Sequence, residues 1–282
     1  PAPRAVRPLR RRGRPSCGRA PGGCAQAGSM ASFTACVTWA SLGVIASGAF
    51  RRSGKILWLR TIYVDEKAHR IRPFARRLIR SIENRVLRHA DLLIANGEDT
   101  AAHYRVRGFD VTVIKNAVDL ERWTMPPPNL AAPLHVGFIG RLAQVKGIDE
   151  FLVAAKSADG SKFVFHIAGD GPARDDAIAL EREGLVRFHG PLPNEGVPKF
   201  LEDMDVCVAL TFAGTDLKKG SGGAGVSNSL LEQMAAGRIL LCWDNPAYRQ
   251  VLDEKSAYLV KQGDPLAISG ALKEVAGDLA EA

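Results

Sequence analysis

Short β-rich runs alternate with helix-like runs along this chain of 282 residues, and the alternation is clearest from residue 134 onward. LHVGFIGRL, KFVFHIAGDGP, DVCVALTF and ILLCWD read as buried strands, and helical spacing marks intervening stretches such as 147–158 and 174–183. Strands that alternate with helices build a parallel sheet covered by those helices. The pattern therefore predicts an α/β fold, and such sheets bind ligands in loops at the carboxyl ends of their strands.

A proline-rich segment at residues 125–133, MPPPNLAAP, divides the chain in two. Its four prolines fix φ and remove backbone donors, so no regular element can continue through it. We expect a linker there, with a partial α/β domain over residues 31–124 and a complete or near-complete one over residues 134–282. A chain of this length with 46% hydrophobic residues can bury two cores.

The positive charge is concentrated in residues 1–30, which hold seven arginines and no acid, whereas the whole chain has a net charge of +8. This segment has no apolar run, so we expect it to be disordered. No aromatic residue lies among the arginines, which favours a non-native tail ahead of a start at Met30 over an RNA- or lipid-binding tail. The rest of the chain is close to neutral, so we expect no specific nucleic-acid partner.

Residues 31–49 are apolar, but threonines and serines interrupt them, so we expect a core strand and helix there rather than a membrane span. The five cysteines are odd in number and lack the spacing of metal ligands. We therefore expect a reducing, cytoplasmic setting and no metal site.

GRLAQVKG, residues 140–147, places two cations where the first strand of the second domain leaves the sheet. Gly140 provides the exit, Arg141 follows it, and Lys146 precedes the next helix. Two cations beside the free amides of a helix N-terminus suit a diphosphate, because the dipole and both side chains act on the same anion. A solvated pair of loop cations is the alternative.

GVSNSLLEQMAAG, residues 225–237, combines a glycine turn, small polar residues at a helix start and a glutamate further along the helix. Glu232 lies between Leu231 and Met234 on a helix that must pack against the sheet. A carboxylate there needs a partner, which a pair of sugar hydroxyls would supply. A capping or rim carboxylate is the alternative.

Together with AGDGP (168–172) and VRFHG (186–190), these stretches resemble in order and spacing the C-terminal domain of retaining GT-B glycosyltransferases of family 4, the glycosyl transferases of group 1. The resemblance implies a GT-B fold of two Rossmann-like domains and metal-independent transfer of a hexose from a nucleotide-diphosphate sugar, with retention and without a cofactor. It implies that Arg141 and Lys146 bind the diphosphate and stabilise the leaving group, and that Glu232 holds the ribose. The other donor contacts that it implies are Gly140, Gly169, Gly171, His189, Gly225, Val226, Ser227 and Asn228.

The N-terminal part resembles the acceptor domain of that family more weakly, through ADLLIAN and VIKNAVDLERW, where Ala117 replaces a glycine of the family signature. Ala224 stands where the family has a second glutamate that contacts the transferred sugar. The opening glycine loop of the acceptor domain and the closing helix have no counterpart, so we expect a chain truncated at both ends. A non-catalytic homologue that binds only a nucleotide sugar or a partner is therefore an alternative.

An NAD-dependent oxidoreductase is the alternative from another class. Gly220, Gly222 and Gly225 spell G-x-G-x-x-G before a helix, and Asp244 closes the next strand, where a ribose-binding acid is expected. Against this interpretation, residues 213–219 separate the first glycine from the preceding strand, although the motif requires a tight turn.

Residues 72–90 predict a helix with Phe74, Leu78, Ile82 and Val86 on one buried face. The same segment holds six arginines and a single acid, Glu83. In the resembled family, this region lies near the mouth of the cleft, where the acceptor saccharide, lipid-linked or small, is presented. The excess of cations indicates contact with an anionic acceptor or with the inner face of a membrane, and a solvated face is the alternative.

Overall fold

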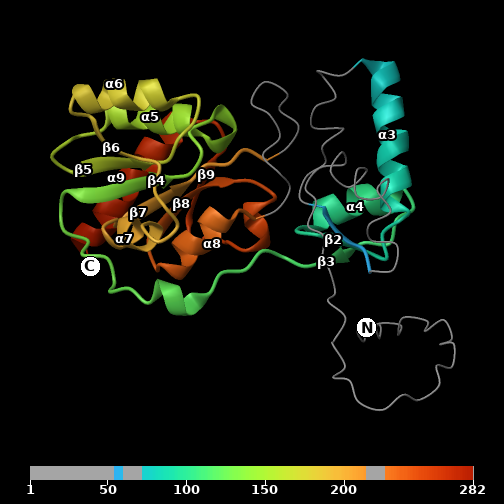
Figure 1. The fold of residues 1–282 in the computed structure, drawn as a ribbon. Coiled ribbons are helices and arrows are strands. Elements are labelled where there is room, and N and C mark those ends of the chain that lie inside the picture. Colours follow the sequence, from blue (N-terminus) through green and yellow to red (C-terminus); the bar gives the residue numbers. More distant parts are fainter. Residues whose placement is uncertain (1–53, 60–71, 214–225, 282) are drawn as a thin grey trace, which may run out of the picture. The chain divides into compact units, whose positions relative to one another are not determined.

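The computed structural model describes residues 54–59, 72–213 and 226–281, and these form two separate parallel sheets (Figure 1). One sheet has three strands in the order β1-β2-β3, and the other has six in the order β6-β5-β4-β7-β8-β9. The expected α/β class with parallel strands is therefore confirmed. The basic tail and the expected strand and helix at 31–49 lie outside the described residues. Within the described part of the chain, no helix is long and apolar enough to cross a bilayer.

The larger sheet arises from the alternation that begins at residue 134. Its strands are β4 (Leu134–Ile139), β5 (Phe163–Ala168), β6 (Val186–Gly190), β7 (Val206–Ala209), β8 (Ile239–Asp244) and β9 (Tyr258–Lys261). Its helices are α5 (Ile148–Ser157), α6 (Arg174–Arg182), α7 (Val197–Glu202), α8 (Asn228–Ala235) and α9 (Pro265–Glu281). Helix α5 contacts α6 and α9 on one face, and α7 and α8 lie on the other (Figure 1). The strand order reverses between β4 and β7, so the carboxyl ends of these two strands frame a crevice of the kind that binds ligands.

The core of this unit is continuous across the sheet because the central strands are apolar on both sides. Phe151 of α5 contacts Phe138 on β4 and Phe165 on β5, and all three rings are buried. On β4, Gly137 has no room for a side chain, because a Cβ would overlap Met204. This close packing fixes where the strands end, and thus where the loops that follow them lie.

Two helices of the larger unit differ from the sequence interpretation. Helix α7 was not expected, because its six residues follow a stretch rich in proline and glycine. The sequence pattern of residues 271–282 predicts a helix, and helix α9 extends further toward the N-terminus, beginning at Pro265. The Asp264 carboxylate accepts hydrogen bonds from the amides of Leu266 (3.0 Å) and Ala267 (3.4 Å), which is the interaction of an N-cap.

The smaller sheet contains β1 (Ile56–Leu59), β2 (Leu92–Ala95) and β3 (Thr112–Val113), with helices α3 (Pro73–Leu87) and α4 (Glu98–Val106). Its own buried cluster includes Leu57, Val86, Leu93, Tyr104 and Val111. DVTVIKNAV, residues 110–118, has the composition of a longer strand, but β3 pairs over only two of these residues. Among the described residues, this sheet has three short strands and a small core.

The apolar face of α3 differs from the expected buried stripe. Val86 is buried, but Phe74 is 82% exposed and Leu78 is 55% exposed, so the prediction of a fully buried stripe is wrong at its N-terminal half. The single acid of the helix, Glu83, is buried and accepts a hydrogen bond at 2.7 Å from Arg107, which lies just beyond α4. The exposed surface of α3 is therefore both cationic and partly apolar.

Residues 125–133 contain no helix or strand and are held along the larger unit by buried polar groups. The Asp205 carboxylate accepts hydrogen bonds from the amides of Leu130 (3.2 Å) and His135 (2.8 Å). The Arg238 guanidinium donates to the carbonyls of Met204 and Pro126. Trp123, at the end of the short helix η2 (Leu120–Trp123), is buried in the core of the larger sheet.

Three histidines form a row across β4, β5 and β6. His135 Nδ1 lies 2.9 Å from His166 Nε2, and His166 Nδ1 lies 3.0 Å from His189 Nε2. The central imidazole is buried, and its neighbours are stacked on it. Burial, followed by the nearby His135, His189 and Arg187, lowers the pKa of His166 to about 4, against an opposing effect of Asp203. The central ring is therefore neutral at pH 7.

Candidate functional site

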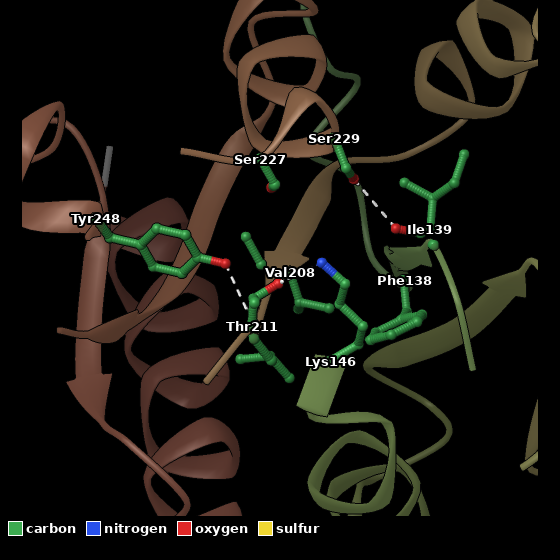
Figure 2. Close-up of a pocket in the computed structure, with 11 residues that line it drawn as sticks. Phe138, Ile139, Lys146, Val208, Thr211, Ser227, Ser229 and Tyr248 are labelled. Atoms are coloured by element: carbon green, nitrogen blue, oxygen red, sulfur yellow. Dashed lines mark hydrogen bonds between the residues drawn. The ribbon is translucent and has the colours of Figure 1, made fainter. Parts of the chain in front are cut away.

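A small cavity of about 40 Å³ lies where β4 and β7 end, at the point where the strand order reverses (Figure 2). Its polar lining comes from four places in the chain: the loop after β4, the loop after β7, the start of α8, and the short helix η4 (Tyr248–Gln250). The polar side chains that line it are Lys146, Thr211, Ser227, Ser229 and Tyr248. One cation and four hydroxyls thus converge at the crevice of the sheet.

Lys146 reaches this cavity from the short helix η3 (Gln144–Lys146). The next residue, Gly147, has φ 72°, and a Cβ there would overlap the backbone of Leu210, so only glycine allows this turn against the end of β7. Lys146 Nζ donates a hydrogen bond to Thr211 Oγ1 at 3.3 Å. Burial, with a smaller effect of the nearby Arg141, lowers the pKa of Lys146 below its usual 10.5.

The first turn of α8 forms the opposite side of the cavity. Ser227 is the N-cap, and its Oγ accepts a hydrogen bond from the amide of Leu230 at 3.2 Å. Ser229 Oγ donates to the carbonyl of Ile139 at 3.1 Å, which fastens α8 to the end of β4 (Figure 2). The first amides of a helix lack intrahelical acceptors, and the helix dipole makes this end positive. This end of α8 and Lys146 therefore favour an anion between them.

Glu232 lies on α8 but does not line the cavity. Its carboxyl group is half-buried, and burial raises its pKa, while Arg122 on η2 acts in the opposite direction. A partly desolvated carboxylate of this kind is suited to accept hydrogen bonds from a pair of hydroxyls. Glu232 lies about one turn beyond the N-terminal end of α8, where a ribose would lie if a diphosphate bound at that end.

The loop after β5, which holds Gly169 and Gly171, lies against the loop after β4 and the end of β6. The Gly169 amide donates to the carbonyl of Gly190 at 2.8 Å, and the Leu142 amide donates to the carbonyl of Asp170 at 2.9 Å. Gly169 has φ 140°, and a Cβ there would overlap the carbonyl oxygen of Gly140. A Cβ at Gly171 would overlap Leu142 in the same way. These two glycines are thus required for the close approach of the loops around the crevice.

Replacing Gly169 with alanine is expected to lower the free energy of unfolding by at least about 2 kcal/mol, because the new Cβ meets both an unfavourable φ and the backbone of Gly140. Gly160→Ala is the matched control, since a Cβ at Gly160 has no neighbour within 4 Å. Urea denaturation of both variants measures the difference. Equal stabilities would show that the loops move apart at no cost.

The structure brings together only some of the residues that the sequence singled out. Gly140, Lys146 and Ser227 line the cavity, whereas Arg141 is exposed beside it and acts on Lys146 by its charge. Asn228 and Val226 flank Ser227 at the start of α8. His189 lies on β6, against His166 and the ring of Phe200. Gly225 and Ala224 lie outside the described residues, as do Gly220 and Gly222.

Sequence reasoning missed Thr211, Ser229 and Tyr248. Thr211 lies two residues after the end of β7, so the rule that ligands bind at strand ends could have found it. Tyr248 comes from beyond β8, and no sequence pattern connects it with Lys146.

Asp244, the acid expected in the oxidoreductase interpretation, instead pairs with Arg249 through two hydrogen bonds of 2.6 and 2.9 Å. No group of three or more side chains suited to a metal ion occurs among the described residues.

Comparison with known proteins assigns the chain to a family. The family model for glycosyl transferases of group 1 matches residues 133–278, just over half of the chain. The chain belongs to this family. The group 1 assignment confirms the resemblance drawn from residues 140–147 and 225–237, and it favours the glycosyltransferase interpretation over the oxidoreductase one.

Curated proteins that are similar to this chain match it over part of their own length. A 2-deoxystreptamine glucosyltransferase of Streptomyces kanamyceticus is 32% identical over an alignment of 151 residues, and the match covers 46% of this chain and 39% of that protein. A putative colanic acid biosynthesis glycosyltransferase, WcaL, of Salmonella typhimurium is 25% identical over 202 residues, which are 67% of this chain and 48% of that protein. The chain thus spans about half or less of the length of these relatives.

Solved structures of low sequence identity share the fold. HepE of Anabaena, crystallised with UDP-glucose, has a TM-score of 0.66 at 16% identity, covering 89% of this chain and 70% of that one. Sucrose-phosphate synthase from Thermosynechococcus elongatus has a TM-score of 0.62 at 20% identity, covering 86% and 63% of the two chains. These similarities confirm the GT-B type of α/β fold expected for a group 1 glycosyltransferase.

Proposed function

We propose that this chain binds a nucleotide-diphosphate sugar and transfers its hexose to an acceptor. The observation that carries the proposal is the convergence of Lys146 and the N-terminal end of α8 on one cavity at the crevice of the sheet. Family membership and the UDP-glucose complex of the structural relative HepE support a nucleotide-sugar donor. The diphosphate lies between Lys146 and the start of α8, with Arg141 at its exposed side.

In the proposed reaction, the bond between the anomeric carbon and the diphosphate breaks, and negative charge grows on the departing phosphate oxygen. Lys146 and the amides at the start of α8 are already aimed at that position, so they stabilise this charge without rearrangement. Arg141 adds a second cation. The acceptor hydroxyl attacks the anomeric carbon from the face that the diphosphate leaves and passes its proton to the departing phosphate oxygen, so the anomeric configuration is retained. No metal ion is required, because these groups neutralise the diphosphate.

Glu232→Gln is expected to weaken the binding of UDP about fivefold to tenfold but to leave the binding of 2′-deoxy-UDP nearly unchanged. A carboxylate accepts two hydroxyl hydrogen bonds, whereas an amide offers one acceptor and one mismatched donor. Isothermal titration of both ligands against both proteins measures the effect. If both affinities fall by the same factor, Glu232 has a structural role and does not bind the ribose.

A non-catalytic protein that only binds the nucleotide sugar is the second candidate, because Ala224 replaces the glutamate expected from the family. Incubation with UDP-glucose, GDP-mannose and ADP-glucose, followed by proton NMR, distinguishes the two candidates. An active enzyme releases nucleotide slowly even without acceptor, and a retaining one releases the sugar first in the configuration of the donor. Binding without any release of nucleotide would support the second candidate.

We also propose that α3 attaches the protein to the inner, anionic face of a membrane, where a lipid-linked acceptor saccharide is presented. Phe74 and Leu78 are exposed on this helix, as are Arg77 and Arg85, and Arg72 is exposed at its N-cap. Its only acid, Glu83, is buried against Arg107, so no exposed carboxylate of α3 offsets these cations. Exposed aromatic and aliphatic side chains beside arginines are typical of helices that lie in the membrane interface.

Co-sedimentation with vesicles of phosphatidylcholine alone or with phosphatidylserine tests this attachment. We expect binding only to the anionic vesicles, and weaker binding at high salt, because each arginine near the surface contributes about 1 kcal/mol that salt screens. Combined Phe74→Ser and Leu78→Ser changes should reduce binding about tenfold. Val106→Ser, at a residue 90% exposed on α4, is the control. A protein that stays in the supernatant at low salt would contradict the proposal.

A further inference from the structure

The loop that leaves β7 is held by side chains that follow the next two strands of the sheet, β8 and β9. Tyr248 Oη accepts a hydrogen bond from the amide of Thr211 at 3.1 Å, and Asn245 Nδ2 donates to the carbonyl of Thr211 at 3.2 Å. Gln262 accepts from the amide of Ala213 at 3.1 Å and donates to its carbonyl at 3.2 Å. Both polar groups of the Thr211 backbone are thus fixed from outside the loop.

Thr211 in turn carries the contact to Lys146. Its Oγ1 accepts the hydrogen bond from Lys146 Nζ, while Tyr248 approaches it from the other side of the cavity (Figure 2). The Tyr248 side chain is 2% exposed, and the Asn245 Oδ1 accepts the Tyr248 amide at 3.0 Å, so the ring has little freedom to move. Tyr248 thus fixes the backbone of Thr211 by a hydrogen bond, and the Thr211 hydroxyl in turn fixes the Lys146 ammonium.

A lysine side chain has several rotatable bonds, so an ammonium without an acceptor samples many positions. A fixed acceptor restricts it before the ligand arrives, and such preorganisation increases affinity because less freedom is lost on binding. The hydroxyl of Tyr248 stays protonated, since burial raises its pKa to about 12. Its oxygen accepts from Thr211, which leaves its O–H able to donate into the cavity that it lines.

We propose that Thr211 and Tyr248 are positioning residues that hold Lys146 Nζ at the site of the donor diphosphate. This inference rests on the proposed role of Lys146, and it adds two residues that neither the family resemblance nor the motifs singled out. It also assigns a role to the residues after β8: they set the position of a cation that comes from the loop after β4. Asn245 and Gln262 support the same loop from behind.

The test uses the full chain and inorganic pyrophosphate, a probe that contains the diphosphate without base or sugar. We expect Thr211→Val to raise the Kd for pyrophosphate about tenfold and Tyr248→Phe to raise it about threefold to tenfold. Thr211→Ser keeps the acceptor oxygen and should stay within about twofold of the wild type. Thr112→Val and Tyr258→Phe are matched controls, because Thr112 lies on the smaller sheet and the Tyr258 hydroxyl bonds Asp278.

A pH series separates positioning from a purely structural role. Loss of the Thr211 oxygen removes an acceptor of the ammonium, so in Thr211→Val the decline of affinity with rising pH should begin at a lower pH than in the wild type. A merely destabilised protein would show a lower Tm and an unchanged pH profile. If both Thr211→Val and Tyr248→Phe bind pyrophosphate with the affinity and pH profile of the wild type, this inference is wrong, whereas the proposed function still stands. A wild-type protein that binds neither pyrophosphate nor any nucleoside diphosphate would overturn the proposed function as well.

Discussion

Replacing Lys146 with alanine is expected to weaken the binding of UDP about 10-fold to 100-fold and to leave the binding of uridine unchanged. The reason is that the ammonium donates a charge-assisted hydrogen bond to the diphosphate in a half-buried site, where water screens it little. Isothermal titration of both ligands measures the difference. The affinity of the wild type for UDP should also decline as pH rises, beginning below pH 10.5, because the pKa of Lys146 is lowered and only the charged form binds.

One control variant and one further variant sharpen this prediction. Lys156→Ala removes an exposed lysine at the end of α5 and should leave both affinities unchanged. Arg141→Gln should weaken UDP binding. In this variant the affinity should begin to decline at a higher pH than in the wild type, because the charge of Arg141 contributes to the lowered pKa of Lys146. If Lys146→Ala reduces the affinities for UDP and uridine equally, the lysine supports the fold and does not bind the diphosphate.

The protein is expected to lose up to about 3 kcal/mol of stability between pH 6.5 and pH 4 through His166 alone. Its pKa is about 4 in the folded protein against 6.5 for a free histidine, so the unfolded chain takes up the proton first as pH falls. The stability is fully present above pH 6.5, falls through the interval, and reaches its lower limit below pH 4. Urea denaturation at a series of pH values measures the loss.

His166→Phe provides the comparison, since it keeps a buried ring and removes the titrating group. Carboxylates contribute to acid unfolding in both proteins, so the difference between the two curves isolates the histidine. His135, His189, Arg187 and Asp203 surround this ring in the folded state and are unchanged in the variant. Parallel curves for the wild type and His166→Phe would contradict the prediction.

The sequence predicted most of the larger sheet, because four of its strands are compact apolar runs followed by a turn or a helix. The strands β4, β5, β7 and β8 were recognisable in this way. Helix α7 was not predicted, because its six residues are too few to show a helical periodicity. The start of α9 was not predicted, because Gly270 and Gly277 weaken the helical pattern of the sequence. The spacing of Phe74 and Leu78 correctly indicated a helix, but spacing alone does not reveal whether another element covers that face.

The candidate site was only partly predictable, for a physical reason. Gly140, Lys146 and Ser227 lie in local motifs whose chemistry can be read from neighbouring residues. Tyr248 reaches Thr211 across 37 positions of the chain, and the histidine row depends on the register of three strands. Contacts of this kind follow from how strands pair, which the sequence pattern of each strand does not contain. The requirement for glycine at Gly169 likewise arises from the distant backbone of Gly140.

A thermal-shift panel on the full chain with UDP, GDP, ADP, dTDP and NAD tests the central claim most directly. A ligand that binds only the folded state raises its stability by RT ln(1 + [L]/Kd), which is about 2.7 kcal/mol at a concentration of 100 Kd and several degrees in Tm. The account predicts a shift with at least one of the four nucleoside diphosphates, and loss of that shift in Lys146→Ala. A shift with NAD alone, or an undiminished shift in Lys146→Ala, would contradict a nucleotide-diphosphate site between the loop after β4 and the start of α8.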